Sequence, residues 1–243
     1  MKRIGIIGAM DMEIAILRDK MKKSGGAREI EAGGFTFYEG SVNGTSAVIV
    51  KSGVGKVNAA LCAQLLITQF KPDAVVNTGV AGALSPGLGI FDIVVSTDAV
   101  YHDMDASVFG YKPTEIPQMK ISAFPADKAL IETAERAFAV SSGRLEHKIM
   151  RGRIATGDQF VASADVKKRI IENCAPACVE MEGAGIAHCC FLNNVPFVIL
   201  RCLSDMADAS VSTTYKFNEK SAAEESASVI IGMLSILAEQ KES

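Results

Sequence analysis

An apolar run followed at once by charged and polar residues constrains the fold most strongly. Residues 195–200 read Val-Pro-Phe-Val-Ile-Leu, and residues 201–205 read Arg-Cys-Leu-Ser-Asp. A continuous hydrophobic run of this length is typical of a strand buried on both faces, as in a sheet covered by helices. Ligands of open α/β sheets bind at the carboxyl ends of strands. A carboxylate there, such as Asp205, could keep its proton near neutral pH and act as a general acid.

Short apolar segments alternate with amphipathic segments along the whole chain. Asn43-Gly44 between two apolar runs predicts a β-hairpin. We expect a single α/β domain over residues 1–243, with a central mixed, largely parallel β-sheet flanked by α-helices. The strands are predicted at 4–7, 35–38, 47–50, 74–77, 93–96, 149–156 and 195–200, and the helices at 13–21, 57–70, 128–139, 165–173, 182–187 and about 221–239.

Composition excludes several classes of function. The net charge of −3, the absence of Trp and the lack of a basic cluster argue against a nucleic-acid partner. No signal peptide and no run of about 18 apolar residues is visible, so no membrane association is expected. The six cysteines contain no CxxC pair and favour buried free thiols in a reducing cytoplasm. Cys174, Cys178, His188 and Cys189 match no standard zinc spacing, so no metal is expected.

Polar groups follow four of the predicted strands, and each has a structural alternative. Glu13 in the segment 8–13 could serve only the dipole of the following helix, and the glycine-containing segment 77–82 could be a simple turn. Glu182 could be solvated, or buried with Arg201 as its partner. Asp205 could serve only as a helix N-cap. Phe160, after another strand, could be a core residue or a stacking surface.

Motifs for other chemistries are missing. The glycines at the amino terminus lack GxGxxG spacing, and the segment 77–82 lacks the GK[ST] ending of a P-loop. His102, His147 and His188 share no spacing with a nucleophile, so no catalytic triad is indicated.

Seven ordered segments together are far more specific than any one of them. The segments are 8–13, 51–57, 77–82, 101–103, 156–160, 179–182 and 204–208. Their order closely resembles the bacterial 5′-methylthioadenosine/S-adenosylhomocysteine nucleosidases of the nucleoside phosphorylase superfamily, across essentially the whole chain.

The resemblance implies hydrolysis of the N-glycosidic bond of methylthioadenosine and adenosylhomocysteine, and of 5′-deoxyadenosine, without a cofactor. Asp205 would protonate adenine N7, Glu13 would activate the attacking water, and Glu182 would bind the ribose hydroxyls. The other substrate-binding positions that it implies are Met181, Phe160, Val161, Ser204, Arg201, Ala9, Met10, Val54, Val80, Ala81, Gly82 and Phe217.

The resemblance also implies a homodimer. Phe109 and Pro117, in the long segment 102–119, would reach the 5′-substituent pocket of the partner. The chain departs from the family at Val80, where Ser is frequent, and at Ala106, where a larger aliphatic residue is frequent. Two extra residues before Phe217 make Tyr215 a competing candidate for the residue that closes over the ligand.

Three alternatives to this function stay open at this point. A phosphorolytic nucleoside phosphorylase would need cationic donors for phosphate, where the amino-terminal loop offers Met10 and Glu13. An aminofutalosine hydrolase would use the same residues on another nucleoside. A nucleoside-binding module would keep the pocket without turnover.

Overall fold

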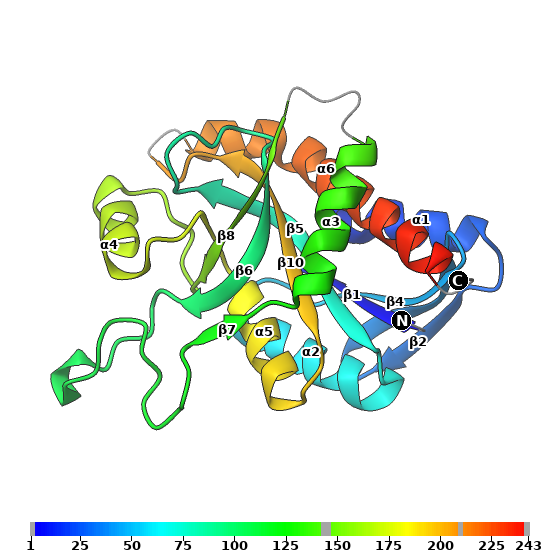
Figure 1. Cartoon of the computed structure of the whole chain (residues 1–243), viewed down its shortest axis with the longest axis horizontal. Coiled ribbons are helices and arrows are strands. Elements are labelled where there is room, and N and C mark those ends of the chain that lie inside the picture. Colours follow the sequence, from blue (N-terminus) through cyan, green and yellow to red (C-terminus); the bar gives the residue numbers. More distant parts are fainter. Residues whose placement is uncertain (1–2, 142–146, 209–210, 241–243) are drawn as a thin grey trace.

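A twisted sheet lies between two layers of helices in the computed structural model, which describes residues 3–141, 147–208 and 211–240 (Figure 1). The strands are β1 (Arg3–Gly8), β2 (Arg28–Ala32), β3 (Phe35–Val42), β4 (Thr45–Lys51), β5 (Ala74–Ala83), β6 (Ile93–Tyr101), β7 (Ala123–Pro125), β8 (Ile149–Thr156), β9 (Cys178–Glu180) and β10 (Phe197–Asp205). The helices are α1 (Asp11–Lys23), α2 (Lys56–Phe70), α3 (Lys128–Ser141), α4 (Ala164–Cys174), α5 (Gly183–Leu192) and α6 (Val211–Glu239), with a short 3₁₀ helix η1 (Ser107–Phe109).

Part of the sheet closes on itself. The closed ring runs β5–β10–β6–β8–β9 and back to β5, and β1, β4, β3 and β2 extend the sheet from β5. The sheet is mixed, as expected. Among the described residues five pairings are parallel, including the long ones β1–β4, β5–β10 and β6–β8, and five are antiparallel. The hairpins at one end, the short strands β7 and β9, and the pair β6–β10 supply the antiparallel pairings.

Two apolar cores cover the two faces of the sheet. Helices α1, α3 and α6 pack on one face, around residues such as Leu17, Leu130 and Ile230. Helices α2 and α5 pack on the other, around residues such as Leu66 and Ile186 (Figure 1). Burying each such side chain stabilises the fold by roughly 1.5–3 kcal/mol. These two cores hold the strands whose carboxyl ends form the site.

The structure extends two strands beyond the predicted ends. β5 continues through the segment 78–82, which the sequence favoured as a turn or loop, and β10 continues to Asp205 instead of ending at Leu200. The two strands pair in parallel along this length. The strand β2 and the first turns of α6 were also not predicted, because their many polar residues lack a clear apolar period. The strand β7 was not predicted either, because three residues are too short to show a period.

The carboxy-terminal helix has unusual apolar character. Its segment Tyr215–Glu239 is long and apolar enough, by length and composition, to cross a membrane, but 56% of the apolar stretch is buried inside the protein. Helix α6 packs against α1, α3, β5 and β10. Its hydrophobicity is therefore accounted for by its place in the core.

Candidate active site

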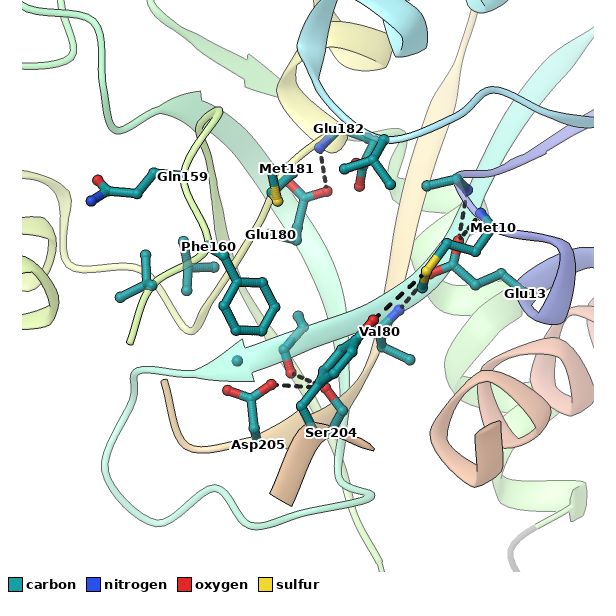
Figure 2. A pocket seen from close by; sticks show the side chains of 17 residues that line it. Met10, Glu13, Val80, Gln159, Phe160, Glu180, Met181, Glu182, Ser204 and Asp205 are labelled. Carbon is teal, nitrogen blue, oxygen red and sulfur yellow. Dashed lines mark hydrogen bonds between the residues drawn. The ribbon is translucent and has the colours of Figure 1, made fainter. Parts of the chain in front are cut away.

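A pocket of about 270 Å³ opens where β1, β5, β8, β9 and β10 reach their carboxyl ends (Figure 2). Segments far apart in the sequence supply its walls. The lining residues are Ala9, Met10, Glu13, Val54, Val80, Ala81, Gly82, Gln159, Phe160, Val161, Val179, Glu180, Met181, Glu182, Ser204, Asp205 and Tyr215.

Glu13 sits in the first turn of α1 and faces the pocket. Its Oε2 accepts hydrogen bonds from the backbone N–H groups of Ala9 (2.6 Å) and Met10 (2.9 Å), and its Oε1 accepts one from Val80 (3.1 Å). The residue is only 2% exposed. Burial raises its pKa, whereas the charge of Arg201 and the three N–H donors act in the opposite direction. Glu13 thus caps the helix and also lines the pocket. A structural role at the helix end and a role in the site, the two interpretations from the sequence, are therefore compatible.

Asp205 ends β10 on the other side of β5 and has fewer donors. Its Oδ1 accepts a hydrogen bond from the backbone N–H of Ala207 (2.8 Å), and its Oδ2 accepts one from the Ser204 hydroxyl (2.9 Å). Burial raises the pKa of Asp205, and these two hydrogen bonds oppose that rise only in part. Such a group can hold a proton and deliver it into the pocket.

Arg201 lies behind the pocket and pairs mainly with a residue that the sequence analysis did not select. The guanidinium is 1% exposed and forms a charged hydrogen bond from Nη2 to Glu180 Oε2. Its Nη2 lies 3.6 Å from Glu182 Oε2, the partner proposed from the sequence. Glu180 belongs to the segment 179–182, but a strand-end pattern does not indicate which of two nearby glutamates reaches the arginine.

Glu182 lies at the amino end of α5, in the pocket wall. Its Oε1 accepts a hydrogen bond from the backbone N–H of Gly55 (2.9 Å), in the loop before α2. Burial and the nearby charge of Glu180 raise the pKa of Glu182 to about 8, while Arg201 lowers it.

Two glycines of β5 make room for these groups. A Cβ at Gly79 would collide with Arg201 Nη1 and lie 2.6 Å from Glu13 Oε1. A Cβ at Gly82 would lie 2.9 Å from Asp205 Oδ1. The glycines in the segment 77–82 therefore let charged side chains approach the strand closely.

Aromatic rings border the pocket near Asp205. The ring centroids of Phe160 and Tyr215 lie 5.3 Å apart, with the rings edge to face, and the Tyr215 hydroxyl lies 3.7 Å from Met10 Sδ. Phe160 is 50% exposed, so it is not a core residue. Phe217, by contrast, is 85% exposed and does not line the pocket.

The structure brings most of the predicted site residues together. Arg201 lies directly behind the lining, and Phe217 is outside it. Phe109 and Pro117 are also outside it, on a loop that projects from the body of the chain (Figure 1). The predicted residues that line the pocket are Ala9, Met10, Glu13, Val54, Val80, Ala81, Gly82, Phe160, Val161, Met181, Glu182, Ser204 and Asp205.

The charges of the lining indicate what this pocket can do. Four lining residues are carboxylates (Glu13, Glu180, Glu182 and Asp205), and none is Lys or Arg. Among the described residues, no group of three or more His, Cys, Asp and Glu side chains is arranged to hold a metal ion. Two buried carboxylates with different partners, on either side of one strand, suit acid–base chemistry on a bound ligand.

Known proteins resemble the chain along nearly its full length. The family model of the phosphorylase superfamily matches residues 3–235. A curated 5′-methylthioadenosine/S-adenosylhomocysteine nucleosidase of Staphylococcus aureus (strain JH9) is 42% identical over 228 residues, which cover 93% of this chain and 96% of that protein.

Solved structures agree with this similarity. The structure of a methylthioadenosine/adenosylhomocysteine nucleosidase from Colwellia psychrerythraea in complex with adenine has a TM-score of 0.90 and 38% identity, and the match covers 96% of this chain and 94% of that chain. The structure of a futalosine hydrolase mutant of Helicobacter pylori has a TM-score of 0.90 and 30% identity, covering 97% of this chain and 100% of that chain.

Proposed function

The chain belongs to the phosphorylase superfamily and, within it, to the 5′-methylthioadenosine/S-adenosylhomocysteine nucleosidases, and from this premise we propose that it hydrolyses the N-glycosidic bond of methylthioadenosine and adenosylhomocysteine. The products are adenine and the 5-thio-substituted ribose, and 5′-deoxyadenosine is a further substrate. One observation carries the proposal: Glu13 and Asp205, two buried carboxylates with different partners, line the same pocket.

Asp205 is the general acid in this proposal. Adenine departs poorly as an anion, so a proton delivered to N7 eases cleavage of the bond between C1′ and N9. The raised pKa of Asp205, caused by burial, supports this role because it favours the protonated form that can donate. As that bond breaks, its electron pair goes to the purine.

Glu13 is the residue that activates water. Burial raises the pKa of Glu13, and the Arg201 charge and the three backbone N–H groups oppose that rise by favouring the ionised form, which is the form that can accept a proton from water. The water oxygen attacks C1′, and Glu13 takes the proton that the water loses. Each proton transfer contributes roughly 10²–10⁴ in rate.

The remaining lining residues bind the two halves of the nucleoside. Glu182 and Met181 bind the ribose, and Phe160 stacks on adenine while the backbone at Val161 binds the edge of the base. We assign the closing aromatic residue to Tyr215 in place of Phe217, because Tyr215 lines the pocket and contacts Phe160.

Hydrolysis is favoured over phosphorolysis by the charges of the pocket. A phosphate site needs convergent cationic or N–H donors, whereas the charged residues of this lining are carboxylates. The test is adenine release in phosphate-free buffer, followed with a coupled absorbance assay. Full activity and a free reducing sugar are expected; strict dependence on phosphate, with a sugar phosphate as product, would overturn the proposal.

Aminofutalosine is a second candidate substrate, since a futalosine hydrolase structure is as similar in fold as a nucleosidase structure. Comparing kcat/KM for methylthioadenosine, adenosylhomocysteine, 5′-deoxyadenosine and aminofutalosine ranks them. The highest value is expected for the thio-substituted nucleosides. A nucleoside-binding module without catalysis would bind them and release no adenine from any.

A homodimer completes the site in this proposal. Phe109 is 81% exposed on the projecting loop, and Val57 and Leu61 are 69% and 56% exposed on α2. Phe109 and Pro117 then contact the 5′ substituent in the partner's pocket. Light scattering should give the mass of two chains, and Phe109→Ala should raise KM for methylthioadenosine; a monomer with full activity would contradict this part.

The cysteines support a reducing cytoplasm as the site of action. All six are free thiols, and five of them are buried. Burial raises the pKa of the Cys62 thiol to about 12, so it is unreactive at neutral pH.

A further inference from the structure

Glu180 has no role in the proposed reaction, yet its buried carboxylate accepts four hydrogen bonds. Its side chain is 2% exposed at the end of β9. Oε2 accepts from the backbone N–H groups of Glu182 (2.9 Å) and Gly183 (2.7 Å), and from Arg201. Oε1 accepts from the hydroxyl of Thr156 at the end of β8. One carboxylate thus joins two strands, the amino end of α5 and the buried guanidinium.

The hydrogens of Arg201 Nη2 are fully used by two partners. This nitrogen carries two N–H groups. One is donated to Asn77 Oδ1 (2.8 Å) and the other to Glu180 Oε2. Glu182 Oε2, at 3.6 Å, therefore receives the attraction of the charge without a hydrogen from this nitrogen.

One oxygen of Glu182 accepts no hydrogen bond from any residue that the structure describes. Its Oε1 is bound to the Gly55 N–H. Its Oε2 lies in the pocket wall, near Arg201. A carboxylate oxygen in this state is suited to accept hydrogen bonds from the hydroxyls of a ligand.

We propose that Glu180 is a positioning residue of the ribose subsite: it occupies Arg201 and the amino end of α5, and so keeps Glu182 Oε2 available for the sugar hydroxyls of the nucleoside. The inference rests on the proposed function for the identity of the ligand. Without the negative charge of Glu180, Glu13 and Glu182 are the carboxylates left to share Arg201, and Glu182 is drawn from the pocket toward it.

The pKa of Glu182 distinguishes this positioning role from a purely structural one, because the charges around Glu182 set that pKa. The groups that act on its pKa are Glu180 on β9, Arg201 on β10 and Glu13 on α1, with the Gly55 N–H before α2. Glu180 raises this pKa and Arg201 lowers it. Removing the charge of Glu180 should therefore shift the titration of Glu182 to lower pH.

The experiment compares two ligands that differ in the ribose. Calorimetry in the Asp205→Asn background measures the Kd of methylthioadenosine, which has the sugar, and of adenine, which lacks it. The variants added are Glu180→Gln, which removes the charge at nearly constant shape, and Glu182→Gln. Thr156→Val removes the hydroxyl that orients Glu180, and Thr156→Ser keeps that hydroxyl as the matched control.

At a pH above the titration of Glu182 in both proteins, Glu180→Gln should weaken methylthioadenosine binding by about tenfold, the scale of one hydrogen bond to a charged group, and change adenine binding less than about twofold. The pH midpoint for nucleoside binding should move to lower pH in Glu180→Gln. The double variant Glu180→Gln/Glu182→Gln should bind methylthioadenosine no worse than Glu182→Gln alone. Thr156→Val should lose less methylthioadenosine affinity than Glu180→Gln, and Thr156→Ser should lose none. If Glu180→Gln fails to fold, the comparison of these two Thr156 variants tests the inference.

Equal losses for adenine and for the nucleoside, or an unchanged pH midpoint, would overturn the inference. The proposed function is scored separately by turnover of the unmodified chain. Ribose-selective losses in a chain that releases no adenine would therefore refute the hydrolytic activity and leave the role of Glu180 standing.

Discussion

Glu13 and Asp205 are buried carboxylates of the same pocket, yet the chain surrounds them differently. Glu13 accepts three backbone N–H groups, and the charge of Arg201 acts on it. Asp205 accepts one backbone N–H and one hydroxyl that can rotate. Fixed N–H donors can only donate and so favour a carboxylate, whereas a hydroxyl can also accept and so tolerates a carboxylic acid. In the proposed mechanism, this difference in the number and kind of donors distinguishes Glu13, as the base, from Asp205, as the acid.

The largest expected effects come from neutralising each carboxylate. Asp205→Asn and Glu13→Gln should each lower kcat by about 10²–10⁴. Only Glu13→Gln should also lower the Tm, because the new amide cannot accept from all three N–H groups, and one unsatisfied donor costs roughly 1–3 kcal/mol. Asn at 205 can accept from Ala207 and donate to the Ser204 hydroxyl. Steady-state kinetics and thermal unfolding measure both; near-normal turnover in either variant would refute the role of that residue.

The pH profile sharpens the same contrast. The proposed mechanism needs Glu13 ionised and Asp205 protonated, so activity should fall as the pH drops through the pKa of Glu13 and as it rises through that of Asp205. Burial raises both pKa values, so the optimum lies above the ordinary carboxylate range. The residual activity of Asp205→Asn should lose the alkaline limb and keep the acid limb. An alkaline limb that survives this substitution would mean that another group is the acid.

A smaller effect is expected at the aromatic ring on the Asp205 side. Phe160→Ala should weaken adenine binding by about tenfold or more, since stacking on an aromatic side chain contributes roughly 1–3 kcal/mol per base. The neighbouring lining residue supplies the matched control, because Gln159→Ala removes a side chain without removing a ring. Calorimetry with adenine makes the comparison, and equal losses in the two variants would argue against stacking.

The smallest effects separate the two candidates for the closing residue. Tyr215→Ala should raise KM about fivefold, the scale of an aromatic pair of roughly 1 kcal/mol. Phe217→Ala should stay within about twofold, because substitutions at exposed positions usually change free energies by less than about 0.5 kcal/mol. KM values for methylthioadenosine give the answer, and the reverse order would return the role to Phe217.

Much of the fold was predictable where burial leaves a pattern in the sequence. The hairpin at Asn43-Gly44 is confirmed, with both residues at positive φ between β3 and β4. The strand at 149–156 is β8, and the helix at 57–70 differs from α2 by one residue. These elements have a full apolar period or a turn with specific residue requirements, so local sequence determines them.

The parts that could not be predicted depend on partners distant in the sequence. β5 continues through Gly79 and Gly82 because β10 and β9 pair with it there, and no local signal records those neighbours. Glu180 is bound to Arg201, 21 residues later, and two glutamates two residues apart give the same pattern. The strand-end rule therefore located the pocket, while the hydrogen-bond partners of its carboxylates depend on contacts that only the folded chain shows.

The strand β5 has a practical consequence for anyone who wishes to redesign this protein. β1, which leads to Glu13, and β10, which ends at Asp205, both bond to it in parallel, so the two backbones are two strand spacings apart, roughly 10 Å. A sheet cannot widen by part of a spacing without losing its hydrogen bonds. New ligands that are longer or bulkier must therefore be accommodated by remodelling residues 159–161 and the turn of α6 around Tyr215.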